Sequence, residues 1–314
     1  MDIFESYQAD NEVFESVKFD LVIASSGYEE RCDWLMTSFN IQAEDKIALI
    51  SSKKHRDIFK GKTNKTFREK GFSFLNLPLE KDDSLIEYLE QYVNDFKGDE
   101  LNILIDYSCM TKVWYSGILN LFSKVDNATS SIHVYFSYTP VKYQKSKKIR
   151  PIKLAESFYN SSKTRNNGKP TVLIIGLGIE PGNADYIKEL IKPDKTILLY
   201  PDPAPKGYVE LLFENNKHII NEIDMRNMIN LPLDDLNSTI ETVTNLILNL
   251  RLKSNIIIAP LGPKTFSLVS MLINAHYPDV DIWRIRSNML QPEIKKQALL
   301  SPIILKVSFT GADE

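Results

Sequence analysis

Short apolar runs of strand length alternate along the chain with amphipathic segments of helix length. In the N-terminal half these runs are residues 21–24, 47–50, 72–75, 101–105 and 132–136, and in the C-terminal half 172–175, 197–200, 218–220, 256–258 and 282–285. Near-continuous apolar strands separated by helices are typical of a parallel sheet covered on both faces, because both sides of each strand are buried. The pattern predicts a Rossmann-like α/β unit in each half.

A five-residue segment occurs twice. Residues 76–80 and 230–234 both read Asn-Leu-Pro-Leu followed by an acid. Each copy leads into an amphipathic stretch and then into an apolar run, at residues 101–105 and 254–258. The separation of roughly 150 residues is far longer than the repeat unit of a solenoid, so it indicates duplicated domains.

The boundary between the two domains is expected in residues 142–168, which are rich in Lys, Ser, Asn and Arg and poor in apolar side chains. We therefore expect domains at 1–165 and 166–314. A further apolar run at residues 303–309 is expected to close the second sheet. The predicted fold class is α/β, with two duplicated Rossmann-like parallel-sheet domains that form a pseudo-dimer.

Composition narrows the choice of partners. The 314 residues carry a formal net charge of −3, with 43% hydrophobic and 25% charged residues, so the chain has no general attraction for nucleic acid or anionic lipid. The sequence has neither a signal-peptide pattern nor an apolar stretch near the roughly 18 residues that span a bilayer, so we expect a cytoplasmic protein without a membrane contact. The only cysteines, Cys32 and Cys109, are too few for a metal cluster or a disulfide framework. We expect no metal and no bound cofactor.

Candidate chemistry in the first half follows the first and fourth strands, where the winding of a doubly wound sheet reverses and ligands bind. The polar residues after these strands are Ser25, Ser26, Gly27, Tyr28, Glu29, Glu30 and Arg31, and Asp106, Ser108, Thr111 and Lys112. Both loops open onto a helix whose N–H groups attract anions. The serines and Thr111 are also good helix caps. Lys112 places a positive charge at the positive end of the helix dipole, which is unfavourable. An anion bound in front of the helix would offset this repulsion.

The corresponding loops of the second half are rich in glycine. They contain Gly176, Gly178, Gly182 and Asn183, and Gly262, Lys264 and Thr265. Glycine lets the backbone approach a phosphate closely, and Lys264 would supply the counter-charge. A tight turn without a ligand is the alternative. The third glycine of a dinucleotide-binding pattern would fall at Pro181, so a nicotinamide or flavin cofactor is not expected.

A basic run at residues 142–150 interleaves one aromatic residue with five cations. It predicts a solvated loop, with a phosphate or nucleic-acid contact as the alternative.

Residues 106–112 fit the pattern acid, any residue, hydroxyl, three of any kind, then a base, after the fourth strand. This resembles the signature of CARF domains, the CRISPR-associated Rossmann-fold sensors, which are similar to the fused SAVED sensors of bacterial antiviral systems. The resemblance implies that a pair of such domains binds a cyclic oligonucleotide, with Ser108 and Lys112 facing its phosphates. The second half keeps only Lys264, with Ala259 and Leu261 in place of the acid and the hydroxyl.

These features lead to one main hypothesis, a nucleotide-binding tandem Rossmann protein that senses or cleaves an oligonucleotide second messenger in bacterial antiviral defence. A sensor would need a partner chain carrying an effector. A cleaving enzyme would use the ligand's own 2′-hydroxyl, with Lys112 or Arg31 stabilising the developing charge.

Three alternatives remain. The chain could be an N-glycosidase acting on a nucleotide such as NAD, with Glu29 or Glu30 beside an oxocarbenium-like centre and Tyr28 stacked on the base. It could instead be a methyltransferase that binds S-adenosylmethionine at residues 176–183. The last alternative is a non-catalytic assembly subunit.

Overall fold

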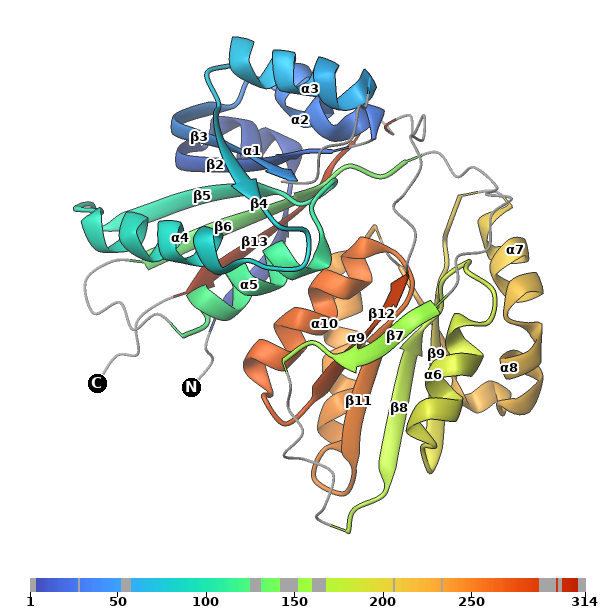
Figure 1. Ribbon diagram of the computed structural model, residues 1–314. Coiled ribbons are helices and arrows are strands. Elements are labelled where there is room, and N and C mark those ends of the chain that lie inside the picture. The colour runs from blue at the N-terminus through green and yellow to red at the C-terminus, as the bar shows by residue number, and fades with distance from the viewer. Residues whose placement is uncertain are drawn as a thin grey trace. The chain divides into compact units, whose positions relative to one another are not determined.

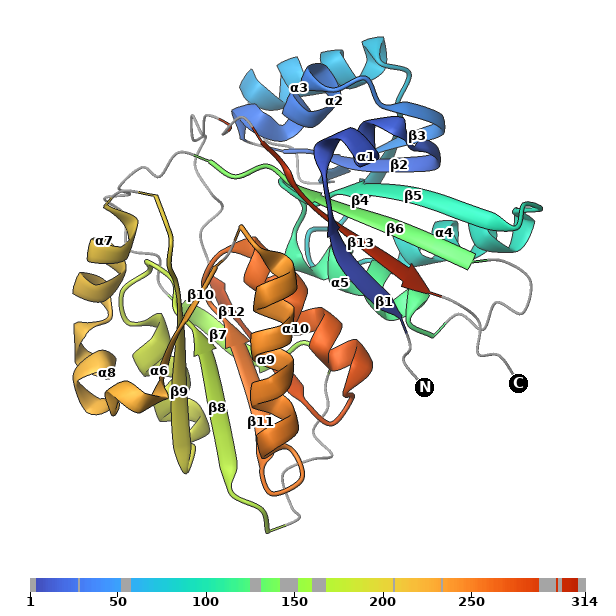
Figure 2. The same cartoon turned by 180° about the vertical axis from the view of Figure 1, so that it is seen from behind.

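A computed structural model describes residues 4–27, 29–51, 58–124, 131–141, 152–159, 168–205, 207–232, 234–287, 298 and 301–309. The chain forms two compact units, one made of residues 1–142 with 291–314 and the other of residues 143–290. Each unit is α/β, with one mixed sheet of mostly parallel strands (Figures 1 and 2).

The sheet of the first unit has seven strands in the order β1-β13-β6-β5-β2-β3-β4. Their bounds are β1 (Glu5–Ala9), β2 (Lys18–Ser26), β3 (Gln42–Ser51), β4 (Ser73–Leu77), β5 (Glu100–Asp106), β6 (Ser131–Tyr138) and β13 (Ile303–Phe309). Strands β2 to β6 are parallel, whereas β13 pairs antiparallel with both β6 and β1.

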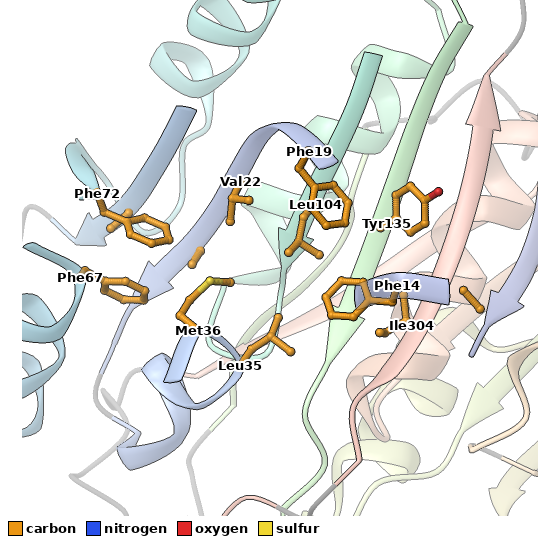
Figure 3. Packing of buried hydrophobic residues seen from close by; sticks show 13 residues of the cluster. Phe14, Phe19, Val22, Leu35, Met36, Phe67, Phe72, Leu104, Tyr135 and Ile304 are labelled. Atoms are coloured by element: carbon orange, nitrogen blue, oxygen red, sulfur yellow. The ribbon is translucent and has the colours of Figure 1, made fainter. Parts of the chain in front are cut away.

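Helices cover both faces of this sheet. The helices α1 (Asn11–Ser16), α2 (Trp34–Ser38) and α3 (Ile58–Glu69) lie on one face, and α4 (Asp83–Asp95) and α5 (Lys112–Phe122) on the other (Figures 1 and 2). A short 3₁₀ helix, η1 (Glu30–Asp33), precedes α2. Figure 3 shows the core under α1 to α3, where Phe14, Leu35 and Phe67 of the helices meet Val22 and Leu104 of the strands. All five are fully buried. Successive strand side chains point to opposite faces, so Val22 and Leu104 can both face these helices.

The sheet of the second unit has six strands in the order β10-β9-β8-β11-β12-β7. Their bounds are β7 (Ile152–Ser157), β8 (Thr171–Gly176), β9 (Lys195–Pro201), β10 (Met228–Leu231), β11 (Asn255–Pro260) and β12 (Asp281–Ser287). All pairs are parallel except β7, which joins β12 antiparallel at the edge.

The described residues of the second unit also form five helices and a 3₁₀ turn. They are α6 (Asn183–Ile191), α7 (Tyr208–Asn215), α8 (Lys217–Glu222), η3 (Met225–Asn227), α9 (Leu236–Leu250) and α10 (Lys264–His276). Side chains of α6, α7 and α8 share one core with β8, β9 and β11. Helices α9 and α10 cover the opposite face (Figure 1).

The five parallel strands follow the same order in both units. Counted along the chain within a unit, that order is third, second, first, fourth, fifth. The repeated segment has the same place in each, because the buried residues Leu77 and Leu231 end the third strands, β4 and β10. A proline follows each leucine, and its carbonyl accepts a side-chain hydrogen bond, from Trp114 Nε1 at 3.0 Å and from Thr239 Oγ1 at 2.8 Å. Leu233 of the second copy lies outside the described residues.

Two expectations about the strands are wrong. Residues 303–309 do form a strand, but it belongs to the first sheet, where β13 lies between β1 and β6 and buries Ile304, Leu305 and Val307. Residues 218–220 lie in helix α8, and the third strand of the second sheet is β10 at residues 228–231. A three-residue apolar run has no periodicity that separates a strand from a buried helical turn.

The division into units also differs from a boundary near residue 165. Strand β7 precedes that boundary but pairs with β12, and β13 follows it but pairs with β6. Both assignments depend on pairing between strands distant in sequence, which composition does not indicate. In the described part of the chain, no helix combines the length and apolar character needed to cross a bilayer.

The pairing of β13 can be tested with Leu305→Ala. Leu305 is completely buried opposite Phe136 of β6, so we expect a loss of about 2 to 5 kcal/mol in the free energy of unfolding of the first unit. Hydrogen exchange should accelerate in β1 and β6. The control Ile258→Ala, equally buried in β11, should accelerate exchange in β8 and β12 instead. Faster exchange in the second unit on Leu305→Ala would contradict the assignment.

A surface cluster of the second unit has a defined pH dependence. The pKa of His218 is raised by its hydrogen bond to Asp185, at 2.8 Å, and by the charge of Glu222. A raised folded pKa stabilises the unit fully below the ordinary value of about 6.5, and this contribution is lost as the pH rises through the folded pKa. In an NMR titration, Asp185→Asn should lower the pKa of His218. The pKa of His133, which burial lowers, should not change.

Candidate functional site

The candidate site lies at the carboxyl edge of the first sheet. Strands β2 and β5 are hydrogen-bonded neighbours there, and the chain winds outward from them in opposite directions. The loop of residues 27–33 after β2 therefore meets the loop of residues 107–111 after β5. The end of β6, at residues 137–139, adjoins the second loop, since Tyr107 N donates to the Ser137 carbonyl at 3.1 Å.

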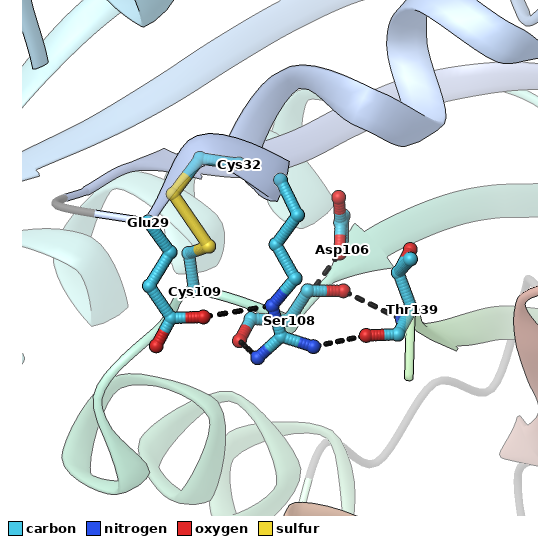
Figure 4. A network of polar contacts seen from close by, with 7 residues as sticks. Glu29, Cys32, Asp106, Ser108, Cys109 and Thr139 are labelled. Atoms are coloured by element: carbon cyan, nitrogen blue, oxygen red, sulfur yellow. Dashed lines mark hydrogen bonds and ion pairs between the residues drawn. A yellow bond between two sulfur atoms is a disulfide. The ribbon is translucent and has the colours of Figure 1, made fainter. Parts of the chain in front are cut away.

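The Arg31 guanidinium joins these three segments through acceptors on Glu29, Ser108 and Thr139, three residues that Figure 4 labels. Its Nε donates to the Glu29 carboxylate at 2.7 Å, Nη2 donates to the Ser108 carbonyl at 3.0 Å, and Nη1 donates to the Thr139 carbonyl. The cation also lies 5.2 Å from the centre of the Tyr138 ring. Only 3% of Arg31 is exposed. A planar guanidinium with donors in a fixed fork can reach three acceptors at once.

Arg31 stays protonated in this position. Burial alone would lower its pKa, but Tyr138 and Glu29 together raise the pKa above its usual value. The pair with Glu29 also keeps that carboxylate, 12% exposed, from facing the site as an isolated charge. Both residues were predicted as catalytic groups. In the structure they serve first to hold the loops together.

Ser108 and Asp106 shape the loop after β5. The Asp106 carboxylate accepts a hydrogen bond from Ser108 N at 3.0 Å, and Ser108 Oγ accepts one from Thr139 N at 2.8 Å. Both side chains are buried, Ser108 completely. Their polar atoms therefore continue the pairing of β5 with β6 beyond the end of the strands.

The two cysteines form a disulfide, which the sequence analysis did not expect. Cys32 and Cys109 are separated by 77 residues along the chain, yet their Cα atoms lie 5.6 Å apart because β2 and β5 are neighbours. Gly27 packs against this bond, since a Cβ atom on it would lie 3.2 Å from Cys32 Sγ. Count and spacing alone could not reveal a pair that tertiary structure brings together.

The partly exposed rim of the site contains the remaining predicted residues. These are Gly27, Glu29, Glu30, Thr111 and Lys112. Helix α5 begins at Lys112, and Thr111 is its N-cap, with Oγ1 accepting from Trp114 N at 3.4 Å. Ser25 and Ser26 are buried, and Ser26 Oγ donates to Asn64 of α3 at 2.6 Å. Tyr28 lies outside the described residues.

Sequence reasoning missed the contribution of β6. The hydroxyls of Ser137 and Thr139 are fully buried and have no hydrogen-bond partner within the part of the chain that the structure describes. Ser137 lies opposite Asp106 in the sheet. The signal was present in the sequence, because a fifth strand lies beside the fourth in this strand order and its polar end had to reach the same edge.

The glycine-rich loops of the second unit pack against each other. A Cβ on Gly178 would lie 2.2 Å from the Leu261 carbonyl oxygen, and one on Gly262 would lie 2.5 Å from the Leu177 carbonyl oxygen. Gly176 similarly leaves room for the Phe266 ring. The close approach of two backbones accounts for these glycines without a ligand.

The other candidates of the second unit lie at the ends of its helices. Gly182 is the N-cap of α6, with a φ of 79° that favours glycine, and Asn183 is the first residue of that helix. Lys264 begins α10. Thr265 is buried, and its hydroxyl has no hydrogen-bond partner among the described residues.

A small cavity of about 10 Å³ lies beside these loops, lined mostly by apolar side chains such as Leu199, Leu231 and Phe266. Ligand pockets are usually about 300 to 1,000 Å³ with a few convergent polar groups. A cavity this small and apolar offers little room for a ligand beside the loops of the second unit. Within the described ranges, no group of three or more His, Cys, Asp or Glu is placed to hold a metal ion. The basic run at residues 142–150 lies outside those ranges.

The role of Arg31 can be tested with Arg31→Lys. A single ammonium cannot reach the Glu29 carboxylate and two carbonyls together, so we expect a loss of about 1.5 to 3 kcal/mol in the free energy of unfolding, measured in urea. The matched control is Arg226→Lys, whose ion pair with Asp224 is solvent-exposed. That variant should unfold like the parent chain. Equal stability of all three proteins would contradict the role given to Arg31.

Comparisons with known proteins add no family to this picture. No protein-family model matches the chain, and no curated protein matches it. The resemblance of residues 106–112 to the CARF signature therefore stays a prediction. A function can therefore be inferred only from the geometry within each unit.

Proposed function

We propose that the chain is a nucleotide-binding protein whose ligand site is the carboxyl edge of the first sheet. The observation that carries the proposal is the meeting of the loops after β2 and β5, at the reversal of strand order, in front of a helix that begins with Lys112. In open α/β sheets this is the position where ligands bind. The ligand class we propose is an oligonucleotide second messenger, cyclic or linear.

The charges at this edge support an anionic ligand. Helix α5 presents the positive end of its dipole toward the rim, and Lys112 adds a further positive charge at its first residue. A phosphate in front of this helix end would interact favourably with both of these charges. The nearby acid Glu29 is paired with Arg31, which reduces its repulsion of a phosphate.

We further propose that the two units arose by duplication and form a pseudo-dimer. The shared strand order and the equal position of the repeated segment support a common origin. In both units the helix after the fourth strand begins with a lysine, Lys112 or Lys264. The loops have diverged, since polar residues fill those of the first unit and glycines pack those of the second. The proposal therefore places one phosphate-binding edge, in the first unit.

The contacts of Arg31 favour binding over cleavage. Each nitrogen of its guanidinium donates to a protein acceptor, so moving it to a reacting phosphate would leave buried carbonyls unpaired. We accordingly propose a sensor, acting with a partner chain that carries an effector in antiviral defence. Thermal unfolding with cyclic oligonucleotides, NAD and S-adenosylmethionine tests the ligand class. A ligand at 100 times its Kd raises the free energy of unfolding by about 2.7 kcal/mol. Stabilisation by NAD alone would refute the proposal that the ligand is an oligonucleotide messenger.

A pair of matched variants tests the site. Lys112→Ala removes a charge-assisted hydrogen bond worth about 1.5 to 3 kcal/mol, so we expect binding of the oligonucleotide to weaken by roughly 10- to 150-fold in calorimetry. Lys264→Ala alters the corresponding residue of the second unit and should leave the affinity unchanged. Equal loss in both variants would show that the second unit also binds phosphate, and no loss in Lys112→Ala would move the site elsewhere.

A further inference from the structure

The disulfide at the candidate site is a second tether between loops that are already joined. Arg31 binds the Ser108 carbonyl, and the next residues along each loop, Cys32 and Cys109, are covalently bonded. The two tethers thus lie side by side in sequence on both loops (Figure 4). The Arg31 contacts and the pairing of β2 with β5 also join these segments, so we expect the fold to persist without the covalent bond.

The surroundings of the bond differ at its two ends. Cys32 is 1% exposed, in η1, and Gly27 packs directly on its sulfur. Cys109 is partly exposed and belongs to the rim, three residues before Lys112. A thiol arriving from solvent therefore meets Cys109 first. Cys32 and Cys109 are the only cysteines in the chain, so no third thiol of the same molecule competes in exchange.

We propose that Cys32–Cys109 is an exchangeable disulfide that sets the rigidity of the rim, with small dithiols and disulfides as its reaction partners. This regulatory role rests on the proposed function of the same edge. In the oxidised form the covalent bond holds residues 109–112 against the loop after β2. In the reduced form the Arg31 contacts still join the two loops, and the rim around Thr111 and Lys112 gains freedom.

The exchange proceeds in two balanced steps. A thiolate of the dithiol attacks Cys109 Sγ, a mixed disulfide forms, and Cys32 leaves as a thiolate that takes a proton from water. The second thiol of the reductant then attacks the reductant sulfur that is bonded to Cys109, closes a disulfide within the reductant and releases Cys109 as a thiolate. The protein gains two thiols, and the dithiol becomes a disulfide. A small-molecule disulfide such as oxidised glutathione reverses the reaction.

Reduction of the full chain tests the proposal without any nucleotide. The protein is equilibrated in glutathione buffers of graded ratio or in dithiothreitol, alkylated with N-ethylmaleimide, and weighed by intact mass spectrometry. We expect a transition from no alkylated cysteine to two, with cooperative thermal unfolding in both forms. Hydrogen exchange should be at least about 5-fold faster in residues 27–33 and 107–112 of the reduced protein, and unchanged in residues 255–264 of the second unit.

Cysteine variants test the same effect without a reductant. Cys109→Ser should reproduce the faster exchange of the rim without reductant, and the double variant Cys32→Ala with Cys109→Ala serves if a single unpaired cysteine impairs folding. Identical exchange of the rim in oxidised and reduced protein would overturn the proposal. Reduction that occurs only as fast as global unfolding would also overturn it, because the bond would then be a structural staple.

The link to ligand binding has its own readout. The oxidised and reduced proteins are compared for binding of the oligonucleotide that stabilises the chain, and we expect at least a 3-fold weaker affinity in the reduced form. Equal affinity would overturn the regulatory role while leaving the nucleotide site intact. Failure of every oligonucleotide to bind would refute the proposed function, whereas the exchange of the disulfide would still be decided by alkylation and hydrogen exchange.

Discussion

The first unit depends on one buried cation. A guanidinium that is 3% exposed must find acceptors inside the protein, because an unpaired buried charge costs several kcal/mol. Arg31 finds them on three segments that end three neighbouring strands. Its requirement for partners therefore determines where the loops after β2 and β5 lie, and these loops in turn determine which groups remain at the rim. Satisfying one charge organises the entire edge of the sheet.

In the second unit the loops after the first and fourth parallel strands are held together in a different way. These loops also meet at the reversal of strand order, but they touch through backbone at Gly178 and Gly262. The disulfide of the first unit has no counterpart there, because the chain has no further cysteine. In the second unit, backbone contact thus takes the place of the Arg31 side-chain contacts that join the loops of the first unit. Two units with one strand order thus offer different surfaces, and the difference lies in a few loop residues.

The strand and helix pattern could be predicted from sequence to the extent that it is local. Buried parallel strands such as residues 101–105 are apolar on both faces and need no knowledge of their neighbours to be recognised. The partner of β13 could not be predicted, since an apolar strand near the C-terminus fits the edge of either sheet. For the site, the strand order predicted that the loops after β2 and β5 would meet, and the hydrogen bond from Arg31 to the Ser108 carbonyl joins them. It did not predict that Arg31 turns inward or that Cys32 meets Cys109, because the direction of a long side chain depends on acceptors supplied by distant segments.

The buried contacts of Arg31 lie beside the partly exposed residues Thr111 and Lys112. This arrangement bears on how the proposed site could transmit a signal. A ligand shifts a protein between states only by as much as it binds one state better than the other. The Arg31 contacts are buried and fully made, so under the proposed function a difference in affinity between two states would come from Thr111, Lys112 and the loop before them. Those residues begin α5, whose side chains from Trp114 to Leu119 are buried without a break. A displacement at the rim is therefore passed into a packed helix, and a close-packed interior transmits such strain.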